Sequence, residues 1–213
     1  MTRFLLSFFV VAVLLAGIPT PSQSQLPPVR ERLGGSLGGV STSGGLNSEY
    51  GNGWSATLYF TERIASSWCI GVSIGAIYMG DLWDPTAAEE YTGIENVASE
   101  MRVLILSVGP QYTLGLSDSW LAWTSLEAGV YSVSLLFDTG VQAFNSSQPA
   151  HFGGNFGLGL LWSITSSWNI DLGATLHHFR TSEKTNDIFH FFTGGDADPF
   201  LLEFSAGIVI DLR

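Results

Sequence analysis

The most constraining feature of this chain is a period of two in its apolar residues, which recurs in six stretches. In the clearest one, from Trp68 to Tyr78, the even-numbered residues are apolar and the odd-numbered ones are mostly small. Because successive side chains of a β-strand point to opposite faces, this pattern predicts strands with one apolar face. The other clear stretches are 54–61, 104–112, 152–162, 168–176 and 202–212. With two less regular stretches at 32–42 and 120–135, the sequence predicts an all-β fold of eight strands.

The composition indicates what covers the apolar face. Charged residues make up 13% of the chain and hydrophobic ones 46%, whereas a soluble domain usually carries about 25% charged residues. No run of about 20 apolar residues follows the N-terminal segment, which excludes a transmembrane helix in the mature chain. A strand of about ten residues, however, crosses a bilayer at the tilt that is usual in barrels. We therefore expect the apolar face to meet lipid.

The opposite face of these strands consists mainly of Gly, Ser, Thr and Asn. It suits the interior of a narrow barrel, since eight strands leave just enough room for side chains to fill. A soluble lipocalin-like barrel or a soluble sandwich would need a charged exterior, which this face does not supply. The sequence thus predicts an eight-stranded antiparallel up-and-down transmembrane β-barrel over residues 32–213.

The connections between the predicted strands alternate in length. Short turns lie at 65–67, 116–119 and 165–167, and long segments lie at about 43–52, 80–99, 137–150 and 181–198. Outer-membrane barrels have short periplasmic turns and longer external loops. This alternation predicts that both ends of the barrel domain are periplasmic and that the four long segments are external.

The short turns also carry a repeat, because a tryptophan follows directly on a serine after each of them, at Trp68, Trp120 and Trp168. Amphipathic aromatic rings favour the boundary between membrane and water. The sequence therefore predicts two aromatic girdles. The periplasmic one comprises Trp68, Tyr112, Trp120, Trp162 and Trp168, and the external one comprises Trp54, Tyr78, Phe152 and Phe200.

The N-terminal segment is predicted to be a signal peptide, residues 1–24. Arg3 supplies its positive start, an apolar run extends to Ala16, and Ser22 and Ser24 precede a cleavage point before Gln25. Residues 25–31 then form a short periplasmic segment, and the Sec export machinery is an expected partner. The formal net charge of −11 excludes nucleic-acid binding through phosphates. The one cysteine, Cys69, allows no internal disulfide and is interpreted as a small apolar side chain.

Parity along the strands assigns a set of polar side chains to the lumen. We expect a hydrogen-bonded plug there, because buried charges need partners. Its predicted members are Arg63, Glu127, Asn155, Asp171 and Glu203, joined by Tyr59, Gln111, Tyr131 and Asn169. Arg63 and Asp171 are predicted to form an ion pair, since both lie near the periplasmic rim. The alternative is a small cation-selective pore.

The four histidines are expected at the external end, where they match no compact metal motif. They are His151, His177, His178 and His190. Neighbours on a strand point to opposite faces, so His177 and His178 should diverge. An outer-membrane enzyme that modifies lipid A is the rival functional class. Ser182 follows His178 at four residues, no supporting acid can be named, and Gly-x-Ser-x-Gly is absent. We therefore expect no catalysis, metal or cofactor.

Taken with the export segment, several stretches resemble the small outer-membrane barrel superfamily, which includes the OmpA transmembrane domain and OmpX-like, porin-family proteins. They are the hairpin from Leu58 to Tyr78, the stretch 152–157 and the final strand 204–212. The resemblance implies residence among outer-membrane lipids of a diderm bacterium and insertion by the barrel assembly machinery. It also implies a structural role in envelope integrity or surface interaction, with external loops that meet an unknown ligand or surface. One departure is the end of the last strand, where Leu212 and Arg213 stand instead of the family's terminal aromatic residue.

Overall fold

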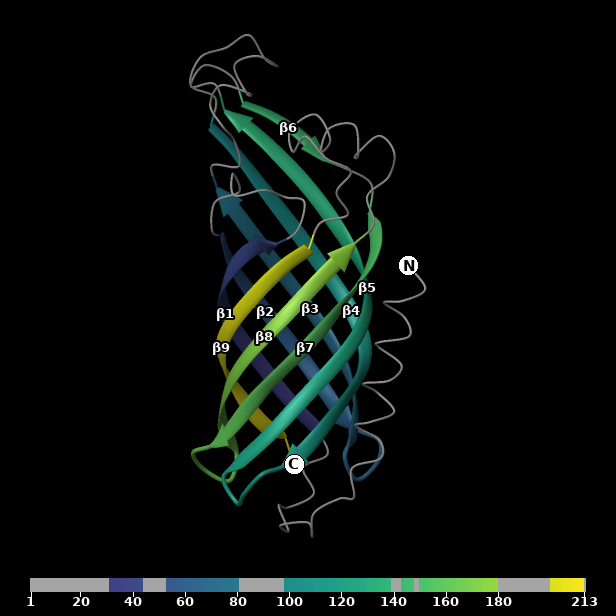
Figure 1. Ribbon diagram of the computed structural model, residues 1–213, viewed down its shortest axis with the longest axis vertical. Coiled ribbons are helices and arrows are strands. Elements are labelled where there is room, and N and C mark those ends of the chain that lie inside the picture. Colours follow the sequence, from purple (N-terminus) through teal and green to yellow (C-terminus); the bar gives the residue numbers. More distant parts are fainter. Residues whose placement is uncertain are drawn as a thin grey trace.

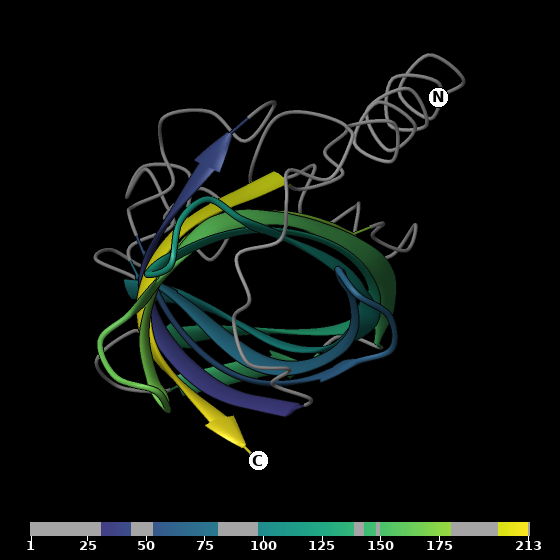
Figure 2. The same cartoon turned by 90° about the horizontal axis from the view of Figure 1, so that it is seen from below.

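The computed structural model describes residues 31–43, 53–80, 98–138, 143–147, 150–179 and 200–212. Eight long strands pair antiparallel in chain order, and the first pairs with the last, so that the sheet closes into a tilted barrel (Figure 1). Seen along its length, the barrel is a continuous ring of strands (Figure 2). The strands are β1 (Glu31–Ser43), β2 (Gly53–Arg63), β3 (Trp68–Gly80), β4 (Ala98–Gly115), β5 (Trp120–Asp138), β7 (His151–Ser163), β8 (Trp168–Phe179) and β9 (Phe200–Leu212). The predicted eight-stranded up-and-down barrel is confirmed.

The predicted signal peptide lies outside the described residues, as do most of the four predicted long segments and His190. Within the described ranges, β1 begins at Glu31, one residue before the predicted start of the barrel domain. No helix among the residues described is long and apolar enough to cross a membrane.

The three short turns close one end of the barrel, here named the turn end, with the same backbone geometry. In each turn, two amides donate to the carbonyl of the tryptophan that follows it, as Ile64 and Ala65 donate to Trp68 at 2.9 and 3.1 Å. The serine before each tryptophan offers its carbonyl to the next hairpin, as Ser67 does to the amide of Thr113 at 2.8 Å. The repeat in the sequence is therefore a repeated turn, and its carbonyls also tie adjacent hairpins together.

Two strands are longer than the expected ten or so residues. β4 has 18 residues and β5 has 19, and both extend the barrel wall at the opposite end, here named the loop end (Figure 1). A ninth strand, β6 (Ala143–Ser147), pairs only with the last residues of β5, from Ser134 to Asp138. β6 was not predicted from the sequence, because its residues show no apolar alternation.

The apolar face of the strands points away from the lumen. Its exposed members on three strands include Leu58 on β2, Leu104 and Leu106 on β4, and Leu158 on β7, while Phe152 has 82% of its surface exposed. The apolar band ends in aromatic side chains at the turn end, where the rings of Trp68 and Tyr112 lie 5.1 Å apart, those of Trp120 and Trp162 lie 5.8 Å apart, and Trp168 is exposed. So large an exposed apolar surface requires a cover.

Candidate functional site

The lumen is the part of the barrel in which polar side chains from distant strands meet, and they lie there in layers. The layer nearest the turn end holds an ion pair between Arg32 on β1 and Asp211 on β9, with Nε and Oδ1 2.9 Å apart. Their side chains are 9% and 13% exposed, so the pair is shielded from solvent. Because β1 and β9 are the first and last strands, this contact ties the seam of the barrel.

A second layer is built around the carboxylate of Asp171. The hydroxyl of Tyr59 donates to its Oδ2 at 2.5 Å, and the indole Nε1 of Trp123 donates to its Oδ1 at 2.8 Å. Both rings also pack against a small apolar cluster of Leu121, Leu161 and Val209. In this layer a buried carboxylate thus has two hydrogen-bond donors, and aromatic and aliphatic side chains pack beside it.

Glycines on the lumenal face make room for these two rings. A Cβ on Gly34 would lie 2.3 Å from the ring of Tyr59. A Cβ on Gly159 would lie 2.7 Å from the indole of Trp123, and one on Gly173 would lie 2.9 Å from it. Since real Cβ atoms do not approach other atoms so closely, each ring occupies space that only a glycine leaves open.

The predicted ion pair between Arg63 and Asp171 is wrong. Asp171 is satisfied by the two neutral donors, and the Nε of Arg63 is buried without a hydrogen bond to any described residue. Both residues do lie toward the turn end, as expected. However, they lie on β2 and β8, and the stagger of the strands around a barrel decides which lumenal side chains meet.

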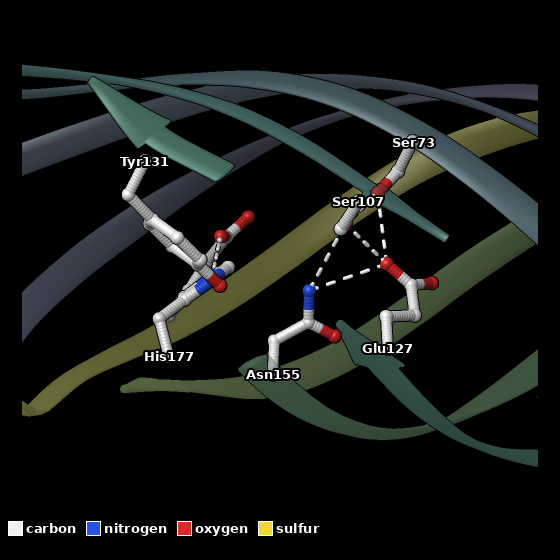
Figure 3. A network of polar contacts seen from close by, with 7 residues as sticks. Ser73, Ser107, Glu127, Tyr131, Asn155 and His177 are labelled. Atoms are coloured by element: carbon white, nitrogen blue, oxygen red, sulfur yellow. Dashed lines mark hydrogen bonds and ion pairs between the residues drawn. The ribbon is translucent and has the colours of Figure 1, made fainter. Parts of the chain in front are cut away.

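The third layer is centred on Glu127 of β5 (Figure 3). Its Oε2 accepts hydrogen bonds from the hydroxyls of Ser107 and Ser73, at 2.5 and 2.9 Å, and from the amide of Asn155, at 3.2 Å. The hydroxyl oxygens of Ser73 and Ser107 also lie 2.6 Å apart. One carboxylate oxygen therefore links four strands, β3, β4, β5 and β7, through neutral donors.

Above it lies a fourth polar group, formed by His177 and Glu203. The Nε2 of His177 is 3.0 Å from Oε2 of Glu203, and both side chains are almost fully buried. The edge of the Tyr131 ring faces His177, with the centroids 6.2 Å apart (Figure 3). The neighbouring His178 points the other way and stacks on Phe200 at 4.3 Å, so the two histidines diverge as expected.

Toward the loop end the lumen is apolar, which corrects the expectation of a polar interior throughout. Ten side chains from six strands form one buried cluster, here named the outer cap, in which none is more than 6% exposed. They are Val40, Ile77, Met79, Met101, Val103, Ile105, Tyr131, Val133, Phe179 and Leu201. In several of these segments the apolar residues point inward and polar ones outward, as with Val133 between Ser132 and Ser134, so an apolar face no longer marks the outside of the barrel.

On the turn-end side of the outer cap lies a polar cavity of about 90 Å³, whose wall includes Trp123 and reaches Arg32. Its wall includes the carboxylates of Glu127, Asp171 and Glu203 together with Ser, Thr and Asn side chains. A polar space of this size has room for several water molecules. Each of the three carboxylates already has hydrogen-bond donors from neighbouring strands. The cavity is therefore a polar space whose carboxylates are already hydrogen-bonded, below an apolar cap.

The Glu127 network predicts a graded response to substitution. Glu127→Ala removes the shared acceptor of Ser73, Ser107 and Asn155, and we expect a loss of about 2 kcal/mol in the free energy of unfolding. Glu127→Gln retains an acceptor oxygen and should lose less than half as much. The measurement is urea unfolding of the refolded barrel in detergent micelles, followed by tryptophan fluorescence. Equal losses for the two variants would contradict the role of the Glu127 oxygen as a shared acceptor.

Several lumenal partners were not among the sequence-predicted members, namely Arg32, Ser73, Ser107, Trp123, His177 and Asp211. Arg32 lies on a glycine-rich strand with few side chains to define its faces, although its position one residue before the outward Leu33 assigns it to the lumen. Trp123 lies in the stretch where the faces are mixed. Of the predicted members, Glu127 and Asn155 lie together in one layer, while Asp171, Glu203 and Arg63 lie apart from it.

Among the described residues, no group of three or more His, Cys, Asp or Glu side chains could hold a metal ion.

Comparisons with known proteins bear on the barrel as a whole. No protein-family model matches the chain, and no curated protein matches its sequence. The solved structure of Neisserial surface protein A is similar with a TM-score of 0.57 at 13% identity, covering 85% of this chain and 97% of that one. A major outer membrane protein from Thermus thermophilus gives 0.56 at 12% identity, covering 84% of this chain and 98% of that one.

This chain has the fold of the small outer-membrane barrels. A barrel of eight strands has an interior just wide enough for side chains to fill. The ion pair, the aromatic layer, the Glu127 network and the outer cap are the means by which this one fills its interior.

Proposed function

We propose that this protein is a sealed outer-membrane barrel of a diderm bacterium, with a structural role. Its turn end faces the periplasm and its loop end faces the outside. The barrel anchors the external loops, which serve envelope integrity or contact with another surface. Outer-membrane lipids, the Sec export machinery and the barrel assembly machinery are its partners, and it carries out no catalysis.

The outward face of the strands supports insertion in a membrane. Its large exposed side chains are aliphatic or aromatic over the middle of the barrel, as in Leu58, Ile74 and Leu106. Aromatic rings bound this band at both ends, with Trp68 and Tyr112 at the turn end and the stacked rings of Trp54 and Tyr78 at the loop end. Aromatic belts of this kind lie at the two boundaries between bilayer and water.

The outer cap is the observation that supports a sealed barrel. Its residues pack across the lumen from six strands and are at most 6% exposed, which supports a closed layer at this level of the barrel. An ion that enters a dry apolar layer loses its hydration shell, and the free-energy cost of that step is far above thermal energy. The cation-selective pore is the alternative, and it would require the outer cap to open.

Measurements on the purified full-length protein and on cells test this proposal. An outer-membrane barrel should migrate differently on SDS gels before and after boiling, and it should fractionate with the outer membrane. In planar bilayers the folded protein should give no steady conductance. An unshifted band in the soluble periplasm would contradict the location, and a large steady current would contradict the sealed state. An altered lipid A acyl pattern in cells that lack the gene would instead indicate an enzyme.

A further inference from the structure

Arg102 occupies a distinct place on the outward face of the barrel, at the edge of the apolar band. Leu104 and Leu106, the next outward residues of β4 toward the turn end, are 60% and 56% exposed. The side chain of Arg102 is itself 56% exposed. A strand rises by about 3.3 Å per residue, so Arg102 lies about 7 Å along β4 beyond Leu104. It therefore stands where the apolar band gives way to polar surroundings.

The guanidinium of Arg102 is held in position by its neighbours. It lies 5.8 Å from the centroid of the Tyr78 ring, which in turn stacks on Trp54 at 5.6 Å. Its Nη2 donates to Oε2 of Glu100 at 2.9 Å. A guanidinium has five N–H donors in a rigid fork, and this contact uses one nitrogen. The group is thus oriented on an aromatic platform with donors left over.

The charge of Arg102 is unusual for its surface. The two other described arginines, Arg32 and Arg63, lie on the lumenal face, so within the described ranges Arg102 is the one arginine or lysine that points outward. Below it, the exposed Leu104, Leu106 and Ile74 form an apolar track on adjacent strands. A cation above an apolar track matches a molecule with an anionic head and hydrocarbon tails.

We propose that Arg102, on its platform of Tyr78 and Trp54, binds the phosphate group of a lipid in the outer leaflet. The planar fork of arginine matches the geometry of phosphate oxygens, and its weak hydration favours contact at an interface. The acyl chains of the same lipid lie along Ile74, Leu104 and Leu106. This inference rests on the proposed insertion of the barrel in the membrane.

Glu100 provides a test of the proposed site, because removing its negative charge should change the binding of an anionic lipid in a predictable direction. Its carboxylate orients the guanidinium but also repels a phosphate at the same place. Glu100→Gln keeps an acceptor oxygen for Arg102 and removes the negative charge, so it should strengthen the binding of an anionic lipid. If the two side chains formed only a surface ion pair, this substitution would leave lipid binding unchanged.

The experiment reconstitutes the full-length protein in phosphatidylcholine bilayers. Electron paramagnetic resonance then measures the motionally restricted fraction of spin-labelled phosphatidic acid and of spin-labelled phosphatidylcholine. One arginine at a membrane surface should favour the anionic label about fivefold. We expect Arg102→Gln to bring this preference close to one and Glu100→Gln to raise it. Arg63→Gln makes the same exchange on the lumenal face and should retain the preference of the wild type.

The possible outcomes separate this inference from the proposed function. A wild type without preference, or an Arg102→Gln variant with the full preference, overturns the lipid site while the barrel remains inserted. Inorganic phosphate at millimolar concentration should not abolish the preference; if it does, the site binds a free anion and the lipid assignment is wrong. If neither label shows a restricted fraction, the barrel has not inserted, and the proposed function fails together with the site.

Discussion

Replacing Gly34 with valine is expected to cost the barrel about 2–6 kcal/mol of unfolding free energy, or to prevent folding altogether. The new Cβ would lie 2.3 Å from the ring of Tyr59 and 2.7 Å from its hydroxyl oxygen, so the ring must leave its place. Overpacking of this kind costs about 1–3 kcal/mol. Displacing Tyr59 also removes its hydrogen bond to the buried carboxylate of Asp171, which adds a cost of about 1–3 kcal/mol.

The same strand provides a matched control. Gly39 lies on β1 as Gly34 does, but it faces outward, and a Cβ added there would meet nothing within 4 Å. Gly39→Val should therefore change the unfolding free energy by less than about 1 kcal/mol. The measurement is urea unfolding in lipid vesicles, read by the fraction that resists the gel shift on boiling. Equal stability of the two variants would mean that the ring of Tyr59 does not pack against Gly34 of β1.

The barrel itself could be predicted from the sequence because it depends on local signals. A period of two sets the faces of each strand, and the serine before Trp68, Trp120 and Trp168 marks the turns. In the structure the backbone carbonyl of each of these tryptophans accepts hydrogen bonds from two amides of the turn before it, which explains why the turn recurs in the chain. Strand order then follows from short turns and closure alone.

The partners inside the lumen could not be predicted, because they depend on how far the strands are staggered. The alternation of side chains along a strand predicts that Arg63 and Asp171 point inward, but it does not predict which side chains lie at the same height across the lumen. The observed partners of Asp171 are Tyr59 and Trp123, which lie 112 and 48 residues away in the chain. No pattern within a single strand records such a contact.

The outer cap was missed for a different reason. Met101 and Val103 belong to the part of β4 next to the acidic stretch 81–100, where the outward residues Arg102 and Leu104 are one charged and one apolar, so they do not define a consistent outer face. Inward methionine and outward leucine are both apolar. Burial, with Met101 and Val103 at 0% exposed, is what distinguishes them.

The two apolar layers of the lumen are expected to act as two seals in series, so that opening either one alone leaves the barrel closed. Met79→Ala with Met101→Ala thins the outer cap, where the two side chains are paired across β3 and β4. Trp123→Ala empties the lower layer, because the glycines that face the indole leave nothing behind to fill the gap. Because the remaining layer would still block ions, neither variant should conduct above the wild type in planar bilayers.

The variant that combines all three substitutions joins the polar cavity to both ends and should give a steady, cation-selective current. Cation selectivity follows from the carboxylates of Glu127, Asp171 and Glu203 in the cavity wall. Each truncation costs about 2–5 kcal/mol, so only protein that retains the gel shift on boiling is recorded. A further Glu127→Gln exchange in this background should weaken the selectivity and leave the channel open. If the two methionine substitutions alone produced the full current, the layer of Trp123 would not be a seal, and the outer cap would close the barrel by itself.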